Sequence, residues 1–289
     1  MTRVAVVLPT KDRPPELARA VRSVLSQTHT DWELHIVDDG SAAPASLATD
    51  DPRVHLHRHD TARGVSAARN TALSAAGGDW VALLDDDDLW APEKLAHQLG
   101  AAATHDAEMV WTATLLIDPV GRVLRANPVM RPDGPETLRR FNVVGEPSSV
   151  LVSRAAVDAA GGFAEDLSIL ADWDLWLRIA PHVGTWALDE PLTAIVEHPG
   201  SMQIVGLTEI ERELAVLAER HGVHPDSPEM ELYLTGKRWA AHRGVRTTAA
   251  YLRASARTHG TRGALRRLAG RGRARTRLAP AWVSELMRC

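Results

Sequence analysis

Residues 80–88 read WVALLDDDD, an apolar run that ends in four consecutive aspartates. Short apolar runs rich in β-branched residues are typical of strands buried on both faces of a sheet. Two further runs of this kind precede it, VAVVL at residues 4–8 and ELHIV at residues 33–37, with a shorter one, VHLH, at 54–57. We therefore predict four strands within the first 90 residues.

Helical segments separate and follow these strands. Apolar residues recur at helical spacing between 17 and 25, and residues 65–76 and 92–103 also have helical character. Strands that alternate with helices predict an α/β fold, with a mostly parallel sheet between layers of helices. Ligands bind beyond the carboxyl ends of such strands, where the acidic pairs and runs at 38–39 and 85–88 stand.

The pattern changes after residue 105. We predict further strands at 109–117, 186–188 and 192–196, and helices at 155–160 and 172–179. After Gly200 the chain reads as helical. We therefore divide it into an α/β domain at residues 1–201 and a helical C-terminal extension with a basic tail at residues 202–289.

Composition excludes several classes of protein. The 289 residues are 45% hydrophobic and 24% charged, which excludes a disordered or fibrous chain. The sequence contains no apolar run of 18 residues, so we predict no transmembrane helix, and the start of the chain does not read as a signal peptide. The one cysteine, Cys289, excludes an internal disulfide, so we expect a cytoplasmic protein.

The net charge of −4 hides an uneven distribution. Residues 237–289 carry 14 lysines and arginines and one glutamate. The basic tail suits peripheral contact with an anionic membrane. The alternatives are pairing with the acidic body of the chain or with a second copy in a homodimer. Aromatic side chains for base stacking are missing between its arginines, so we expect no nucleic acid partner. The basic run is Arg262, Arg266, Arg267, Arg271, Arg273, Arg275 and Arg277.

The four aspartates at 85–88 need a physical reason, since adjacent carboxylates repel one another. Alternate residues of an extended strand point to the same side, so we expect Asp85 and Asp87 to converge. Carboxylate oxygens are the ligands that Mg²⁺ or Mn²⁺ prefers. The competing interpretation is a solvated acidic turn.

Three other places have chemistry that suits a ligand. Asp38 and Asp39 follow a strand and can bind a nucleobase edge or ribose hydroxyls, although Asp-Gly is also a turn sequence. Arg69, on a predicted helix, either binds phosphate, braces the acidic run or forms an ordinary ion pair. Asp172 shares a helix face with Trp176, which suits a sugar-binding wall that contains a base; the alternative is an N-capping aspartate.

Seven motifs, in order and at the usual spacing, resemble family 2 glycosyltransferases with the GT-A fold. The resemblance covers about residues 3–201, and we find none beyond them. Its motifs are VVLPTKDR at 6–13, VDDGS at 37–41, AARN at 67–70, LDDDDLWAP at 84–92, GGF at 161–163, DWDLW at 172–176 and HPGS at 198–201.

The resemblance implies inverting transfer of a hexose from a nucleotide-diphosphate sugar, most commonly a UDP-sugar, with Mg²⁺ or Mn²⁺ as cofactor. It implies the general base at Asp172, metal ligands at Asp87, Asp85 and His198, and a sugar or acceptor wall of Trp90, Trp173 and Trp176. The nucleotide-binding residues that it implies are Pro9, Thr10, Asp12, Arg13, Asp38, Asp39, Arg69, Asp85 and Asp86.

One departure from the family pattern concerns the base. The family often has Glu-Asp where this chain has Ala171-Asp172, so the base keeps its place and loses an acidic neighbour, for which Glu165 is a candidate substitute. That loss leaves open a catalytically silent nucleotide-sugar-binding protein. A nucleotidyltransferase of similar fold would need a glycine-rich loop after the first strand, where this chain reads PTKDRP at 9–14. The acceptor stays open among saccharides, lipid-linked saccharides, peptides and natural products.

Overall fold

The computed structural model describes residues 2–197, 207–241 and 279–288, with short helical pieces at 249–251, 253–255 and 257. The described residues form two compact units. The first lies within Met1–Arg131, Val144–Val196 and Arg277–Cys289, and the second within Pro132–Val143 and Glu197–Thr276. The predicted boundary between residues 201 and 202 falls outside the described residues, as does the basic run at 262–277.

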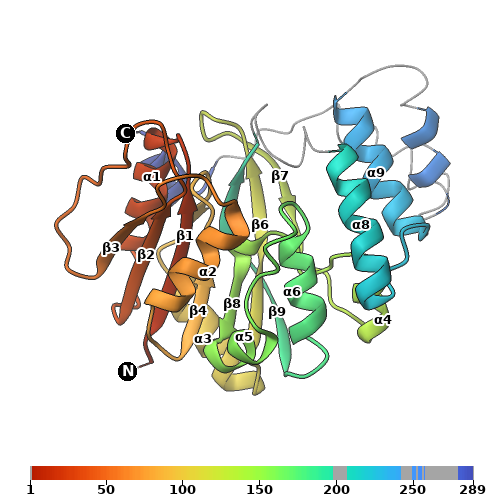
Figure 1. The fold of residues 1–289 in the computed structure, drawn as a ribbon, viewed down its shortest axis with the longest axis horizontal. Coiled ribbons are helices and arrows are strands. Elements are labelled where there is room, and N and C mark those ends of the chain that lie inside the picture. The colour runs from red at the N-terminus through yellow and green to blue at the C-terminus, as the bar shows by residue number, and fades with distance from the viewer. Residues whose placement is uncertain are drawn as a thin grey trace. The chain divides into compact units, whose positions relative to one another are not determined.

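One sheet organises the first unit (Figure 1). Its strand order is β3-β2-β1-β4-β8-β6-β9-β5, with β7 paired to β6. The predicted strands of the N-terminal half pair in parallel, β3 with β2, β2 with β1 and β1 with β4. They span β1 (Val4–Thr10), β2 (Trp32–Asp38), β3 (Val54–Arg58) and β4 (Trp80–Leu83). This arrangement confirms the predicted α/β fold class.

The second half of the sheet is mixed in direction. Strand β8 runs antiparallel to both β4 and β6, while β9 runs parallel to β6 and antiparallel to β5. The two strands predicted at 186–188 and 192–196 form one strand, β9, whose pairing with β6 shifts register in the middle. The bounds are β5 (Leu89–Trp90), β6 (Met109–Ile117), β7 (Val123–Asn127), β8 (Val150–Ser153) and β9 (Thr185–Val196).

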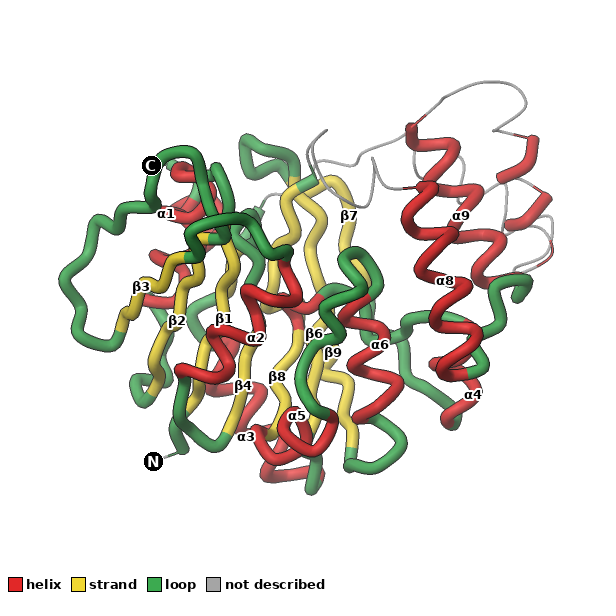
Figure 2. The backbone as a smooth tube through the Cα atoms, viewed as in Figure 1, coloured by secondary structure: helices red, strands yellow, loops and turns green. Residues whose placement is uncertain are grey.

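Helices flank this sheet, and the tube in Figure 2 separates them from the strands by colour. Helix α2 passes in front of the sheet in Figure 1 and contacts β1 and β2. The helices of the first unit are α1 (Pro14–Leu25), α2 (Val65–Ala75), α3 (Lys94–His105), α5 (Arg154–Ala160), α6 (Ala171–Ile179) and α11 (Ala281–Leu286), with a 3₁₀ turn, η1, at Pro147–Ser149. Within this unit, Val283 and Leu286 of α11 join the apolar cluster built on β6, β7 and β9.

The second unit is helical in its described residues, with α4 (Pro135–Arg140), α8 (Leu207–His221) and α9 (Pro228–Ala241). Helix α4 was not expected from the sequence. It is tied to the loop between α8 and α9, because the amide of His224 donates to the carbonyl of Arg139 at 2.9 Å. None of the helices in the described residues combines the length and apolarity of a membrane span.

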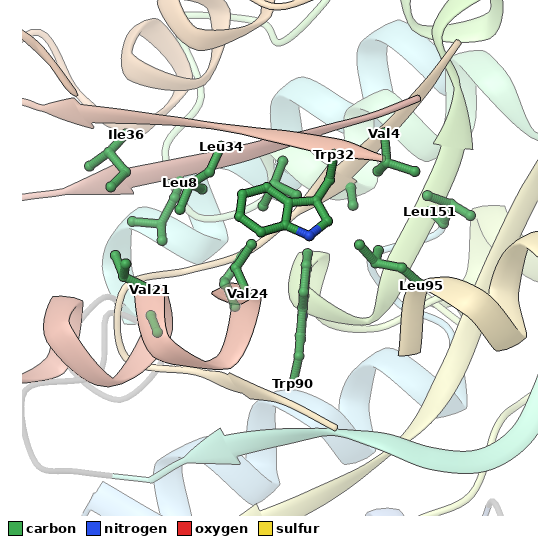
Figure 3. Packing of buried hydrophobic residues seen from close by; sticks show 14 of the residues in the cluster. Val4, Leu8, Val21, Val24, Trp32, Leu34, Ile36, Trp90, Leu95 and Leu151 are labelled. Carbon is green, nitrogen blue, oxygen red and sulfur yellow. The ribbon is translucent and has the colours of Figure 1, made fainter. Parts of the chain in front are cut away.

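The main core lies between α1 and the parallel strands (Figure 3). Alternate residues of β1 and β2 face α1, which is the pattern expected when one face of a strand packs against a helix. Trp90 also belongs to this core and is completely buried. The labelled members are Val4, Leu8, Val21, Val24, Trp32, Leu34, Ile36, Trp90, Leu95 and Leu151.

Candidate active site

The carboxyl ends of β1, β2 and β4 meet at one edge of the sheet. Thr10, the last residue of β1, lies opposite Asp38, the last residue of β2, and residues 85–88 follow β4 after one intervening residue, Leu84. This is the edge where the fold predicts a ligand site. The residues predicted around the donor therefore come together from three strand ends.

The four aspartates form a turn rather than an extended strand. The amide of Asp88 donates to the carbonyl of Asp85 at 3.1 Å, which closes the turn. The predicted extended geometry is therefore wrong, but the side chains still alternate in exposure. The side chains of Asp85 and Asp87 are 31% and 18% exposed, whereas that of Asp86 is 8% exposed and Asp88 is buried.

The two less exposed carboxyls, those of Asp86 and Asp88, form an inner pair that is held by hydroxyl donors. Thr10 Oγ1 donates to Asp86 at 2.7 Å, and Ser148 Oγ donates to Asp88 at 2.6 Å. Burial, together with the neighbouring Asp87, raises the pKa of Asp86 to about 6. The same two causes raise the pKa of Asp88 well above its ordinary value. The inner pair therefore carries less negative charge than its composition suggests.

Two arginines pair with the more exposed, outer carboxyls, those of Asp85 and Asp87. Arg13 Nη1 lies 2.6 Å from Asp87 Oδ2 and 3.1 Å from Asp86 Oδ1. Arg69 Nη2, on a nearly buried side chain of α2, lies 2.6 Å from Asp85 Oδ1. Of the roles weighed for Arg69, the structure shows the brace on the acidic run. These two cations balance charge that would otherwise repel within the turn.

Asp38 is a structural residue of this edge. Its carboxylate accepts hydrogen bonds at 2.9 Å from the amides of Ser41 and Ala45 and pairs with Arg58, and the residue is 1% exposed. These bonds outweigh burial, so the pKa of Asp38 lies below its ordinary value. In this structure its oxygens form the turn after β2, and its contact with a nucleotide stays a prediction.

Asp39 anchors the loop before α2. It accepts from the amides of Arg63 and Gly64 at 2.8 Å each and lies 2.7 Å from Nδ1 of His59. These bonds lower its pKa against the opposing effect of burial. Its contact with a nucleoside stays a prediction.

Asp12 links the end of β1 to the turn after β2. Its amide donates to Ser41 Oγ at 2.9 Å, and its Oδ1 accepts from the amide of Ala42 at 2.8 Å. The backbone of Asp12 has φ 55°, a left-handed conformation that aspartate tolerates better than most residues. Pro9, the residue before Thr10 at the end of β1, is buried within the sheet.

Asp172 is the second residue of α6, after the N-cap position at Leu170. The N-cap alternative for this aspartate is therefore wrong. Burial and the charge of Glu146 raise its pKa to about 7, while Arg69 acts in the opposite direction and Asp85 adds to the rise. A carboxyl with a pKa near the operating pH suits a general base. Arg69 and Asp85 therefore connect Asp172 electrostatically to the acidic turn.

Glu146 is the site residue that the sequence analysis missed. It precedes η1, and its charge raises the pKa of both Asp172 and Asp88. The candidate substitute, Glu165, instead accepts from Asn70 at 3.1 Å and lies 3.7 Å from Arg63. The acidic neighbour of the predicted base thus comes from a loop before η1. Its only signal in the sequence was a glutamate beside Pro147.

The three tryptophans of the predicted wall are core residues. Trp90, Trp173 and Trp176 are at most 1% exposed, and Trp90 Nε1 donates to the carbonyl of Ser148 at 2.8 Å. Helix α6 is buried on nearly every side, so its tryptophans cannot line an open sugar site. The wall prediction is therefore wrong. His198, the third predicted metal ligand, lies outside the described residues.

The outer carboxyls fit a hard divalent cation by their chemistry. Asp85 and Asp87 present partly exposed oxygens on one acidic turn, and Mg²⁺ and Mn²⁺ prefer such ligands. Their present partners are Arg69 and Arg13, side chains that can balance the charge of the same oxygens.

Comparison with known proteins places the chain in a family. The family model described as "Glycosyl transferase family 2" matches residues 5–156. The chain is 30% identical over 215 residues to the "Putative colanic acid biosynthesis glycosyl transferase WcaA" of Escherichia coli K12, covering 70% of this chain and 75% of that protein. It is 36% identical over 99 residues to the E. coli "UDP-Glc:alpha-D-GlcNAc-diphosphoundecaprenol beta-1,3-glucosyltransferase WfgD", covering 33% of this chain and 39% of WfgD.

Solved structures share the fold at lower identity. S. aureus TarS in complex with UDP-GlcNAc matches with a TM-score of 0.59 and 14% identity, over 89% of this chain and 80% of TarS residues in that structure. The mannosyltransferase PcManGT from Pyrobaculum calidifontis, in complex with GDP-Man and Mn²⁺, matches with a TM-score of 0.56 and 23% identity, over 99% and 84% of the two chains. The sheet and the site at its strand ends agree with the family match. The chain therefore belongs to glycosyl transferase family 2 and is a glycosyltransferase with the GT-A fold.

Proposed function

We propose that this glycosyltransferase moves a sugar from a nucleotide-diphosphate sugar, with a UDP-sugar as the first choice, to an acceptor hydroxyl in one inverting displacement. The observation that carries the proposal is Asp172, a buried carboxyl with a pKa raised to about 7, coupled electrostatically to Arg69 and Asp85. Two relatives support the donor class, since WfgD is named as a UDP-Glc transferase and TarS was solved with UDP-GlcNAc.

The donor would lie at the ends of β1 and β2, close to the acidic turn. Asp12 and Ser41 already join these two strand ends and offer polar groups to a nucleoside. Arg13 sits between this end of β1 and Asp87, so its guanidinium is placed to balance the charge of a diphosphate as well as that of the turn. Asp39 would act here through the loop that it holds.

Asp87 and Asp85 would hold Mg²⁺ or Mn²⁺, and a bound cation would supply Lewis-acid stabilisation of the nucleoside diphosphate as it leaves. The solved structure of PcManGT is a complex with GDP-Man and Mn²⁺, which supports this cofactor class. Asp86 and Asp88 would keep the turn in shape through their hydroxyl donors.

Asp172 would act as the general base. Its carboxylate would take the proton of the acceptor hydroxyl while that oxygen bonds to the anomeric carbon and the bond from this carbon to the diphosphate breaks. Each atom is accounted for, because the proton ends on Asp172 and the electron pair leaves with the nucleoside diphosphate. A single displacement inverts the anomeric centre and needs no nucleophile from the enzyme.

A panel of nucleotide sugars with Mn²⁺ tests the reaction class. We expect release of a nucleoside diphosphate from a UDP-sugar, by slow hydrolysis or by transfer to an added saccharide or lipid-linked acceptor. Release of pyrophosphate from a nucleoside triphosphate and a sugar phosphate would instead identify a nucleotidyltransferase. Tight nucleotide-sugar binding without turnover across acceptors would identify a silent binding protein.

Membrane contact and homodimer formation depend on the basic tail, which lies outside the described residues. Both stay predictions. Co-sedimentation with anionic vesicles tests membrane contact, which predicts weaker binding by a full-length variant with Arg266→Gln, Arg267→Gln, Arg271→Gln and Arg273→Gln. This variant keeps α11, whose Val283 and Leu286 lie in the core.

A further inference from the structure

Three histidines and a glutamate gather on the parallel half of the sheet and play no part in the donor site. Glu33 and His35 are on β2, and His55 and His57 are on the edge strand β3. His35 lies directly opposite His55 in the pairing of these strands. Since residues two apart on a strand share a face, all four side chains point to the same side of the sheet.

His35 is the centre of this cluster. Its ring lies 4.7 Å from the ring of His55 and 5.3 Å from that of His57, between centroids. Its Nδ1 lies 3.1 Å from His57 Nε2, and its Nε2 lies 3.6 Å from Glu33 Oε1. One ligand atom each from Glu33, His35 and His55 lies within 4.8 Å of the other two.

A second observation points to a ligand at the same place. His35 is 4% exposed, and among the described residues its Nε2 has no hydrogen-bond partner. A buried ring nitrogen without a partner costs free energy, so native structures avoid it unless something satisfies the group. This nitrogen faces the carboxylate of Glu33.

We propose that Glu33, His35 and His55 form a binding site for a transition-metal cation of the Zn²⁺ class, with His57 orienting His35. Imidazole nitrogens and a carboxylate oxygen are the mixed ligands that this class of cation takes. In the tautomer in which His35 Nδ1 donates to His57 Nε2, Nε2 of His35 is left for the metal, as second-shell partners of ligating histidines arrange it.

The geometry needs only a small adjustment. In a tetrahedral zinc site, ligand atoms lie about 3.3 Å apart, a separation that follows from bonds of about 2.0–2.1 Å. His35 Nε2 and Glu33 Oε1 are already 3.6 Å apart. His55 is exposed on an edge strand, so its ring can close the remaining gap and gives a cation access from solvent. Water would complete the coordination.

Glu33 is held from two other directions, by the amide of Gly77 at Oε1 and by Arg3, whose Nη1 lies 3.7 Å from Oε2. Arg3 opposes a cation here, so we expect modest affinity.

The cation would fasten the edge strand β3 to β2. The next two residues after His57 support the donor edge. Arg58 pairs with Asp38, and His59 pairs with Asp39. A metal cross-link between β2 and β3 would therefore help to hold the loops after β2 in place. This role is structural and separate from the acidic turn.

Cobalt binding to the full chain without a histidine tag tests the proposal. We expect one equivalent of Co²⁺ to give visible d–d absorption in the wild type, and Zn²⁺ to displace it. His55→Ala and Glu33→Gln should each lose this spectrum, with circular dichroism confirming the fold. The control His182→Ala, at an exposed position of the first unit, should keep it. Asp87→Ala should also keep it, which separates this site from the acidic turn.

Thermal unfolding provides an independent measurement. Zn²⁺ should raise the Tm of the wild type and of His182→Ala by more than that of His55→Ala, because a ligand of the native state stabilises it. The proposal is overturned if the wild type shows no visible absorption from Co²⁺ bound to histidine, if folded His55→Ala keeps the full spectrum, or if Asp87→Ala removes it. Should a variant misfold, the wild-type cobalt spectrum decides, since octahedral oxygen-only coordination contradicts histidine ligation.

Discussion

Arg69 Nη2 lies 2.6 Å from Asp85 Oδ1, and the charge of the same arginine lowers the pKa of Asp172. One side chain of α2 thus affects both the acidic turn, which the proposal assigns to the cation, and the carboxyl, which it assigns to the base. Arg69 is nearly buried, so its position is set by packing and by this ion pair.

Replacing Arg69 should impair turnover through both partners. In Arg69→Ala we expect kcat/KM to fall by about 10- to 100-fold, because Asp85 loses its arginine partner and the pKa of Asp172 rises further. The acid limb of the pH–rate profile should move to higher pH. Arg69→Lys keeps the charge and should keep the limb closer to that of the wild type. An unmoved limb in Arg69→Ala would contradict the coupling to Asp172.

Asp87→Ala should remove metal-dependent nucleotide binding. Calorimetry of UDP binding with and without Mn²⁺ should show the metal enhancement in the wild type and its loss in the variant, since Asp87 offers partly exposed oxygen to a hard cation. Asp158→Ala, an exposed carboxylate paired with Arg154 on α5, is the matched control. Unchanged UDP affinity of Asp87→Ala in the presence of Mn²⁺ would remove its ligand role.

Trp90→Ala should destabilise the protein by about 3–5 kcal/mol, the usual cost of removing a buried aromatic ring. Urea unfolding measures this loss, and Trp186→Ala, at a partly exposed tryptophan stacked on His105, should cost less. If Trp90→Ala kept wild-type stability and lost only sugar binding, the core assignment would be wrong.

The pKa of Asp172 has a consequence for stability. The unfolded aspartate releases its proton near its ordinary pKa of 3.8, and the folded one near 7. The wild type therefore loses stability relative to Asp172→Asn as pH rises through this window, by at most about 1.4 kcal/mol per pH unit. Chemical denaturation of both proteins at pH 4, 5.5 and 8 measures the difference. A constant difference would show that the pKa is not raised.

Much of the donor edge could be predicted because strand ends are easy to read. The apolar runs of β1, β2 and β4 stop at polar residues, and parallel strands bring such ends to one edge. The pairing of Arg69 with the acidic run was among the alternatives for the same reason, since α2 precedes β4. The order of β8, β6 and β9 could not be predicted, because their directions depend on long-range pairing.

The errors concern what a side chain contacts. Asp38 and Asp39 look equivalent in sequence, yet Asp38 bonds to amides of the turn after β2, whereas Asp39 bonds to amides of the loop before α2. Trp173 and Trp176 suited a sugar wall, but α6 is enclosed, which the sequence does not reveal. Glu146 was missed because it acts on Asp172 from a loop that is distant in the sequence. Residues Asp85–Asp88 form a turn instead of the expected extended strand, because the amide of Asp88 bonds back to the carbonyl of Asp85.

Turnover of Asp172→Asn tests the central claim most directly, because the substitution removes the base and keeps the size of the side chain. Its kcat should be about 10²- to 10⁴-fold below that of the wild type, with circular dichroism and UDP affinity preserved. The control Asp158→Asn should retain activity. In the wild type, kcat/KM should rise with pH through about 7, the pKa of Asp172. Near-normal turnover of folded Asp172→Asn, with the same pH profile, would contradict the assignment of the base.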